Sequence, residues 1–344
     1  MSGGVDSSVA ASLLKSQGYS LIGATMCLGI TDNEGRAACC GPEAVKDARK
    51  VCDLLDMPHY VLEYSKFLYE YVITDFISEY RAGRTPNPCV RCNRFLKFSE
   101  LLRFARSLGY SAIATGHYAR KGVFKGRTVL MRDPQNTKDQ SYFLYSIPRE
   151  VIDHVVFPVG TLTKDEVRSV ALKAGLPVAS KAESQEICFI PDNEYRSFLR
   201  RNGVEDHRGS FVDRNGNILG THRGIFNYTI GQRKGLGIAA GSPLYVAEIS
   251  AEDNRVVLGS KKDLLAAGCD AHQINLFVEK LPETCTAKVR YGQKDIPCSV
   301  TLQSEVIRVT FDEPVEAVTP GQSLVLYQDT VVLGGGIIRN VFRM

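Results

Sequence analysis

The stretch Met1-Ser2-Gly3-Gly4-Val5-Asp6-Ser7-Ser8 opens the chain, and an expected helix follows it from Val9 to Leu14. Two glycines before a helix let the backbone approach a ligand closely, and serine hydroxyls add hydrogen-bond donors. The N-terminus of a helix attracts anions because its free N–H groups and its dipole are positive. The stretch therefore predicts a phosphate-binding loop, with an ordinary capped helix as the alternative.

The loop lacks the Gly-Lys-Ser/Thr ending of a Walker loop, and it is not a dinucleotide fingerprint. It resembles the SGGxDS loop of the PP-loop pyrophosphatases, which bind ATP and release pyrophosphate while they adenylate a substrate. Such a loop follows a buried parallel strand, whereas this sequence begins at the loop. We therefore expect a parallel sheet with its first strand missing. A start codon assigned too late would explain this, and we favour it over a true gap with weak ATP binding.

The composition is that of a globular protein, since 44% of the 344 residues are hydrophobic and 23% are charged. Such a length suits two or three domains. No apolar run approaches the roughly 18 residues that span a membrane, and no leader opens the chain. We therefore expect a cytoplasmic protein with no membrane partner. The net charge of +4 permits a nucleic-acid partner without requiring one.

Helix-like and strand-like stretches alternate over residues 1 to about 120, which predicts an α/β domain with a parallel sheet. Met26 and Gly116-His117 end two of these strands. They therefore fall where the nucleotide of the loop would lie, at the carboxyl edge of the sheet. The expected elements of the first half are strands at 21–26, 59–62 and 112–118, helices at 42–55, 67–80 and 163–174, and a hairpin at 123–132.

The second half of the chain is mostly strand-like, after an expected helix at 192–202. Turn signals such as Asp213 to Asn217 separate its short apolar runs. Strands at regular spacing predict a small closed barrel. The expected barrel strands are 287–291, 298–302, 306–311 and 323–327.

Ten cysteines without an export signal indicate reactive thiols, metal ligands or small hydrophobic residues rather than a disulfide framework. Cys92 lies among prolines and asparagines, so we expect it in a loop or at a helix start. Arg91 and Arg94 beside it would favour the thiolate that a nucleophile needs. Cys188 has apolar neighbours, so a buried strand residue is as good an interpretation as a reactive thiol, unless Cys188 is paired with Cys92. His117 could act in the site or only bond locally.

The pair Cys89-x-x-Cys92 allows a second interpretation. Together with Cys188 it could hold a [4Fe-4S] cluster by three thiolates, with one iron left open. A zinc site is a weaker hypothesis, because no second CxxC or spaced histidine pair completes a tetrahedral set. Otherwise we expect no metal ligands.

Six stretches occur in order: SGGVDSS at 2–8, RTPNPCVRCN at 84–93, ATGHYAR at 114–120, KDQSYFL at 138–144, ESQEICFI at 183–190 and GIFNYTIGQRKGLGI at 224–238. Together they resemble the tRNA-specific 2-thiouridylase (MnmA) family. The resemblance implies three parts: an adenine-nucleotide α-hydrolase-like catalytic domain over 1–193, a small β-rich central domain over 194–262 and a C-terminal β-barrel over 263–344.

The resemblance also implies an activity, the replacement of the 2-oxygen of the wobble uridine of tRNA by sulfur. ATP, with Mg2+, is cleaved to AMP and pyrophosphate. Cys92 is then the nucleophile and Cys188 carries a persulfide, supplied by a donor protein of a desulfurase relay. We expect the enzyme to be a monomer.

Two further sets of residues are implied by the resemblance. ATP is bound by the loop and by two strand ends: Ser2, Gly3, Gly4, Val5, Asp6, Ser7, Met26 and Gly116. The tRNA is contacted by Asn87, Pro88, Cys89, His117, Lys138, Asp139, Gln140, Arg290, Tyr291 and Gln322. Many members of the family carry Asp where this chain has Cys89, which leaves an acid–base role at that position open and strengthens the cluster hypothesis.

The sequence leaves two alternatives open. Another PP-loop enzyme, such as an amide-forming synthetase, would not need Cys92 and Cys188. A tRNA-binding protein that has lost catalysis would keep its affinity for tRNA but release no pyrophosphate.

Overall fold

The computed structural model describes residues 1–29, 42–182, 187–190 and 194–344, which form two compact units. Residues 183–186, the first part of the ESQEICFI stretch, lie outside this part of the chain. The first unit comprises Met1–Val72, Cys89–Asn193 and Thr330–Val332, and the second comprises Ile73–Pro88, Glu194–Asp329 and Leu333–Met344. None of the helices in the described ranges is long and apolar enough to cross a membrane.

Parallel strands form the centre of the first unit, as predicted. They lie in two separate pairs: β1 (Gly23–Cys27) with β2 (His59–Glu63), and β3 (Ile113–Ala114) with β6 (Val155–Val156). The expected strand at 112–118 is therefore much shorter, because the chain leaves the ladder after Ala114. The predicted hairpin is present as β4 (Arg120–Phe124) and β5 (Arg127–Met131), which are antiparallel.

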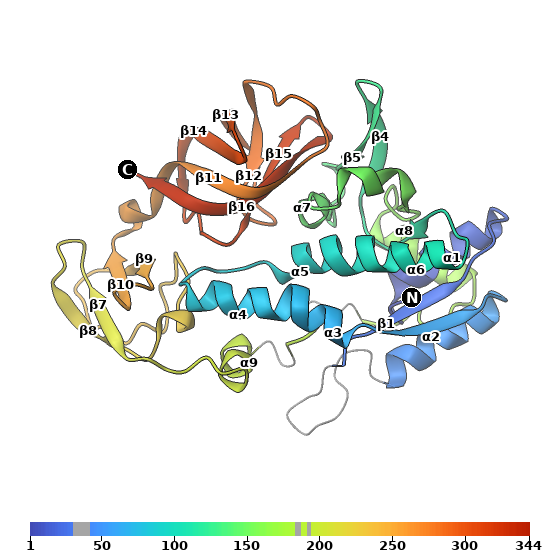
Figure 1. Cartoon of the computed structure of the whole chain (residues 1–344), viewed down its shortest axis with the longest axis horizontal. Coiled ribbons are helices and arrows are strands. Elements are labelled where there is room, and N and C mark those ends of the chain that lie inside the picture. Colours follow the sequence, from blue (N-terminus) through green and yellow to red (C-terminus); the bar gives the residue numbers. More distant parts are fainter. Residues whose placement is uncertain (30–41, 183–186, 191–193) are drawn as a thin grey trace. The chain divides into compact units, whose positions relative to one another are not determined.

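Helices flank these strands, and α1 packs against α8 through buried Val5, Val9, Val167 and Ala171 (Figure 1). The capping box predicted for α8 is present, since Glu166 N–H donates to Thr163 Oγ1 at 3.3 Å and Thr163 N–H to Glu166 Oε2 at 2.7 Å. The helical elements of this unit are α1 (Val5–Ser16), α2 (Pro42–Leu54), α3 (Ser65–Leu68), η1 (Tyr69–Ile73), α5 (Pro88–Arg91), η2 (Cys92–Glu100), α6 (Leu101–Ser107), α7 (Ser141–Leu144), η3 (Arg149–His154) and α8 (Lys164–Lys173).

A continuous helical run extends from Pro88 to Ser107, and its middle part, η2, is π-helical. Cys92 is the first residue of that stretch. Long π-helical segments are rare, and they occur frequently at functional sites. The helix predicted at 67–80 is likewise divided, into α3, η1 and α4 (Thr74–Arg81), the last of which belongs to the second unit.

The second unit contains a four-stranded sheet in the order β8-β7-β10-β9, where β7 and β10 are parallel. Its core includes Phe211, Val246 and Val256, which are nearly inaccessible. The turn predicted around Asp213 is present, because this carboxylate accepts from the N–H groups of Asn215 and Asn217 at 2.8 Å. The elements are α9 (Tyr195–Arg201), β7 (Gly209–Val212), β8 (Ile218–His222), η5 (Ile225–Asn227), β9 (Tyr245–Ser250), β10 (Arg255–Gly259) and η6 (Lys261–Leu264).

The predicted closed barrel is confirmed: six strands follow one another in the order β11-β14-β13-β12-β15-β16, and β11 also pairs with β16 (Figure 1). The strand predicted at 287–291 ends earlier because Arg290 starts a turn in which Gly292 has φ +74°. The strands are β11 (Leu265–Leu276), β12 (Thr284–Lys288), β13 (Ile296–Gln303), β14 (Val306–Glu316), β15 (Ser323–Gln328) and β16 (Val331–Arg343).

Candidate active site

The predicted phosphate-binding loop forms a tight turn before α1. Gly3 has φ +70°, and a Cβ atom on it would lie 2.5 Å from the carbonyl oxygen of Ala44 in α2, so only glycine is tolerated there. Ser2 Oγ accepts from the N–H of Gly4 at 3.3 Å and lies 2.9 Å from Ser7 Oγ. Two hydroxyls and one backbone N–H therefore converge at the start of the helix.

Asp6 is held in place by two side chains from other parts of the first unit. Its Oδ1 accepts a hydrogen bond from the hydroxyl of Tyr118 at 2.8 Å. The same oxygen forms an ion pair with Lys164 Nζ at 2.7 Å. The Lys164 side chain is only 14% exposed. A carboxylate in a phosphate-binding loop would repel its ligand, and this lysine offsets that charge.

A second lysine contacts the loop backbone. Lys181 Nζ donates to the carbonyl oxygen of Gly3 at 3.0 Å and to Asp47 Oδ2 at 2.8 Å. Tyr118, Lys164 and Lys181 add to the residues that the sequence predicts for this site. The sequence indicates Tyr118 only as part of the ATGHYAR stretch. Neither lysine lies in one of the six stretches that resemble the family.

The two strand-end residues predicted beside the nucleotide lie in the first unit as well. A Cβ on Gly116 would approach the backbone of Asp6 and Ser7 to 2.5 and 2.6 Å, so its lack of a side chain allows direct contact with the loop. Met26 is half-buried in β1, opposite Leu62 of β2. The neighbouring Thr25 Oγ1 donates to the carbonyl of Met1 at 2.7 Å.

The loop is suited to a triphosphate, because the glycine cradle leaves no room for a Cβ and its donors converge on one point. Magnesium ions in nucleotide sites are held by the phosphates and one or two carboxylates. Asp6 is the carboxylate that the loop itself offers.

Cys92 is buried, and its environment differs from the one expected. Burial raises the pKa of the Cys92 thiol from its ordinary value of 9.0 to about 12; Lys97 opposes this rise, and Cys188 and Cys89 add to it. The expectation of a favoured thiolate is therefore wrong for the structure as it stands. The helix begins at Pro88, so Cys89 occupies its first turn and Cys92 lies inside it.

The two arginines expected to favour the thiolate stack on an aromatic ring instead. The guanidinium carbons of Arg91 and Arg94 lie 5.0 and 5.5 Å from the centre of the Phe95 ring, and Arg91 Nε also donates to the carbonyl of Tyr71 at 2.9 Å. Phe95 stacks in turn on Tyr71, with ring centres 5.1 Å apart. The charged group that lowers the pKa of Cys92 is Lys97, and neither arginine contributes to it.

Cys188 is exposed in a turn, so the alternative of a buried strand residue is wrong. Although it lies 96 positions after Cys92, it is near enough for its charge to act on both Cys92 and Cys89. The structure thus brings the three predicted cysteines into one neighbourhood, with Lys97 as the nearby cation. In the described ranges, however, no three or more Cys, His, Asp or Glu side chains are arranged to hold a metal ion. The iron–sulfur hypothesis for Cys89, Cys92 and Cys188 therefore has no support.

His117 lies between the loop and the helix of Cys92. Burial lowers its pKa well below the usual value, and the charge of Lys97 lowers it further. Its ring centre is 5.9 Å from that of Phe98 in η2, and its Nδ1 is 2.9 Å from Thr115 Oγ1. These effects favour the neutral form of His117.

The Lys138-Asp139-Gln140 stretch mostly supports its own backbone. Asp139 accepts from Ser141 Oγ at 2.5 Å and from the N–H of Asp133 at 3.0 Å, and Gln140 Oε1 accepts from the N–H of Tyr118 at 3.0 Å. Lys138 is half-buried. Gln140 thereby positions Tyr118, whose hydroxyl group donates a hydrogen bond to Asp6.

In the second unit, Gln322 anchors the segment that leads to the cysteines. Its Nε2 donates to the carbonyl of Thr85 at 2.8 Å, and Thr85 N–H donates to the carbonyl of Pro320 at 2.9 Å. Asn87 is half-buried and Pro88 is buried, whereas Cys89 is exposed. Of the barrel residues expected to touch tRNA, Arg290 is exposed and bonds to the carbonyl of Ala317 at 3.2 Å, and Tyr291 is 44% exposed.

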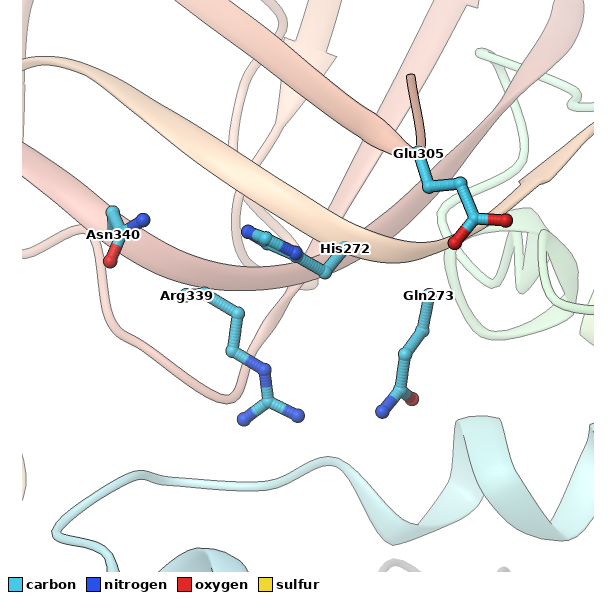
Figure 2. A pocket seen from close by; sticks show the side chains of 5 residues that line it. All are labelled: His272, Gln273, Glu305, Arg339 and Asn340. Carbon is cyan, nitrogen blue, oxygen red and sulfur yellow. The ribbon is translucent and has the colours of Figure 1, made fainter. Parts of the chain in front are cut away.

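An open hollow of about 580 Å³ lies on the barrel surface, lined by His272, Gln273, Glu305, Arg339 and Asn340. Figure 2 shows Arg339 and Gln273 extending from the strands toward the same open space. Arg339 is already paired with Glu79 at 2.6 Å. None of the residues predicted for catalysis or binding lines this hollow.

Known protein families match three consecutive parts of the chain. The family described as tRNA methyl transferase HUP domain matches residues 1–192, the tRNA methyl transferase PRC-barrel domain matches 196–260, and the aminomethyltransferase beta-barrel domain matches 266–338. The tRNA-specific 2-thiouridylase MnmA 1 of Syntrophus aciditrophicus is 48% identical over 100% of this chain and 92% of its own length. The tRNA-specific 2-thiouridylase MnmA of Acetivibrio thermocellus is 48% identical over 98% of each chain. The chain therefore belongs to the tRNA-specific 2-thiouridylase (MnmA) family, whose members are tRNA-uridine 2-sulfurtransferases.

Proposed function

We propose that this enzyme adenylates the 2-oxygen of the wobble uridine of tRNA with ATP and then transfers sulfur to carbon 2 from a persulfide on Cys188. One observation carries the proposal: the segment 114–118 joins the loop to the cysteines. Gly116 and Tyr118 contact the loop. His117 packs against Phe98 of η2, and the charge of Lys97 lowers its pKa. A base adenylated at the loop would thus lie near the thiols.

Adenylation activates a poor leaving group. The uridine 2-oxygen attacks the α-phosphorus of ATP and pyrophosphate departs. Negative charge develops on the phosphates in this step, and donors such as Ser2 Oγ, Ser7 Oγ and the N–H of Gly4 are placed to stabilise it. Lys164 limits the opposing charge of Asp6.

Sulfur transfer then uses both cysteines. The terminal sulfur of the Cys188 persulfide attacks carbon 2, and AMP leaves with the former 2-oxygen. Cys92 attacks the Cys188 sulfur, which releases 2-thiouridine and leaves a Cys92–Cys188 disulfide for an external thiol to reduce. Alternatively, Cys92 attacks first and frees sulfide, which adds to carbon 2; the same disulfide results.

The exposure and protonation of the two thiols are consistent with these different roles of Cys188 and Cys92. Cys188 is exposed and open to a donor protein, whereas Cys92 is buried and stays protonated. Cys92 must lose its proton to attack, and Lys97 is the neighbouring cation that favours the thiolate. Cys92 is therefore kept from external oxidants until it is used.

The tRNA contacts of this proposal divide by exposure. Arg290, Tyr291 and Cys89 are exposed and are proposed to meet the RNA directly. Asp139, Gln140 and Gln322 are proposed to act by holding backbone segments, since their side chains already bond to the protein. We also propose a desulfurase-relay protein as sulfur donor, a monomeric enzyme and a cytoplasmic location.

Mass spectrometry of wobble-uridine thiolation tests the proposal, with purified enzyme, ATP, tRNA and a cysteine desulfurase with free cysteine as sulfur source. Wild type should form 2-thiouridine with one pyrophosphate released per product. Cys188→Ser should form none, yet still release pyrophosphate. Product formation by Cys188→Ser would instead favour an enzyme that does not use the cysteines. Retained tRNA binding without pyrophosphate release by wild type would favour a protein that has lost catalysis.

A further inference from the structure

Lys181 joins two parts of the first unit that are far apart in sequence. It lies seven residues before Cys188, and its ammonium group reaches the carbonyl of Gly3, 178 positions away, at 3.0 Å. The same group is paired with Asp47 of α2 at 2.8 Å. The Lys181 side chain is 39% exposed and that of Asp47 is 26% exposed. An ion pair this exposed adds little to stability, so the contact with the loop needs another explanation.

The peptide geometry of the loop supplies one. In a planar trans peptide the C=O and the following N–H point in opposite directions. A lysine that holds the Gly3 carbonyl therefore orients the N–H of Gly4 to the other side, where Ser2 Oγ accepts it at 3.3 Å. At 3.3 Å this bond is long, so a phosphate oxygen can replace the hydroxyl at little cost.

Glycine at position 3 makes such support necessary. With φ +70° and no side chain, this residue has more backbone freedom than any other type, and its peptide can rotate. We infer that Lys181 is a positioning residue of the nucleotide site, which fixes the Gly3–Gly4 peptide so that the Gly4 N–H is directed at a phosphate of ATP. Its ammonium group also offsets the partial negative charge of the Gly3 carbonyl, which would otherwise repel the phosphates.

This inference rests on the proposed function, because it assumes that ATP binds at the loop. The experiment measures ATP affinity by titration calorimetry without tRNA, and the KM for ATP and kcat of pyrophosphate release with saturating tRNA. The variants are Lys181→Met, Lys181→Arg and Lys173→Met. Lys173, the last residue of α8, is an exposed matched control.

We expect Lys181→Met to weaken ATP binding and raise the KM about ten-fold, with kcat within about two-fold, because a ground-state contact is lost. Lys181→Arg should recover most of the affinity, and Lys173→Met should match wild type. Equal ATP affinity of Lys181→Met and wild type would overturn the inference while leaving the proposed function intact. So would a lowered Tm with no recovery by arginine, since that marks a structural role. No ATP binding by wild type itself would overturn the proposed function, and this inference with it.

Discussion

Cys285 and Cys298 face each other across strands β12 and β13 with their sulfurs 3.8 Å apart, whereas Cys92 and Cys188 come from a helix and a turn 96 positions apart. The barrel pair shares a hydrogen bond that lowers the pKa of Cys285 and raises that of Cys298. The other pair has Lys97 nearby and one exposed member, Cys188. The roles proposed for Cys92 and Cys188 therefore rest on the exposure of Cys188 and on the nearby Lys97, and not on closeness of two sulfurs.

The strongest test of this contrast removes one thiol from each pair. Cys188→Ala should lower tRNA thiolation at least about 10³-fold, because no persulfide can form at the site. Cys285→Ala should stay within about two-fold of wild type. Thiolation is measured as 2-thiouridine per tRNA by mass spectrometry, with protein folding checked by circular dichroism. A comparable loss in Cys285→Ala would mean that the barrel pair takes part in sulfur transfer.

The second test concerns the protonation of Cys92. A thiol with a pKa raised to about 12 by burial is neutral at ordinary pH, so its thiolate fraction near pH 8 is on the order of 10⁻⁴. Iodoacetamide should therefore modify the exposed Cys188 well before Cys92. The rate at Cys92 should rise about ten-fold per pH unit until the pH approaches its pKa.

Lys97→Met provides the control for that experiment. Lys97 lowers the pKa of Cys92, so its removal should slow alkylation of Cys92 further at every pH below about 12. Peptide mapping after timed labelling gives the order of modification. Labelling of Cys92 as fast as Cys188 near pH 8 would contradict the raised pKa.

Local signals predicted much of the fold. Thr163 and Glu166 are three positions apart, and their capping box forms α8 as expected. The turn at Asp213 follows from the hydrogen bonds of its own carboxylate. Strand β16 was not predicted, since Gly334 to Gly336 interrupt its alternation; Gly334 adopts φ +139° so that the backbone of Asn275 can approach.

Predictions about the site failed where they depended on tertiary neighbours. The six motifs indicated Cys92 and Cys188, but nothing near Arg91 in the sequence shows that Tyr71, twenty positions earlier, accepts its hydrogen bond. Arg91 and Arg94 lie over the ring of Phe95, which itself stacks on Tyr71. In the same way, Lys181 is assigned to the loop only once the fold places it against Gly3.

The two units also differ in how they use buried charge. In the first, Lys164 balances a loop carboxylate; in the second, Glu79 receives Arg84 at 2.7 Å and Arg339 at 2.6 Å, and only 7% of the Glu79 side chain is exposed. Glu79→Gln would leave two guanidinium groups without their carboxylate. Because both arginines are partly exposed, we expect a loss of about 2 kcal/mol in the free energy of unfolding, measured in urea.

The pH dependence of this site has a definite sign. Burial alone would raise the pKa of Glu79, but the hydrogen bonds and charges of Arg84 and Arg339 outweigh it and lower the pKa below its ordinary value of 4.5. The stabilisation is therefore complete above pH 4.5 and is lost as the pH falls through the lowered value of the folded protein. Glu79→Gln should flatten this part of the profile. Equal acid sensitivity of the variant and wild type would assign the acid transition to other carboxylates.

The smallest expected effect on tRNA thiolation is that of oxidising the barrel pair, Cys285 and Cys298. Directly opposed residues of antiparallel strands have Cα atoms about 4.5 to 5.5 Å apart, which is inside the range of about 4.4 to 6.8 Å that a disulfide spans. Diamide, which takes up two hydrogens, should thus join Cys285 to Cys298 with little movement of β12 and β13, and the linked peptide should be absent from Cys285→Ala. Because β12 and β13 are already paired through the ladder, thiolation should change by less than about two-fold once the Cys92–Cys188 pair has been selectively reduced. A large change would show that the barrel must flex during the reaction, and it would remove the contrast between a structural and a reactive pair.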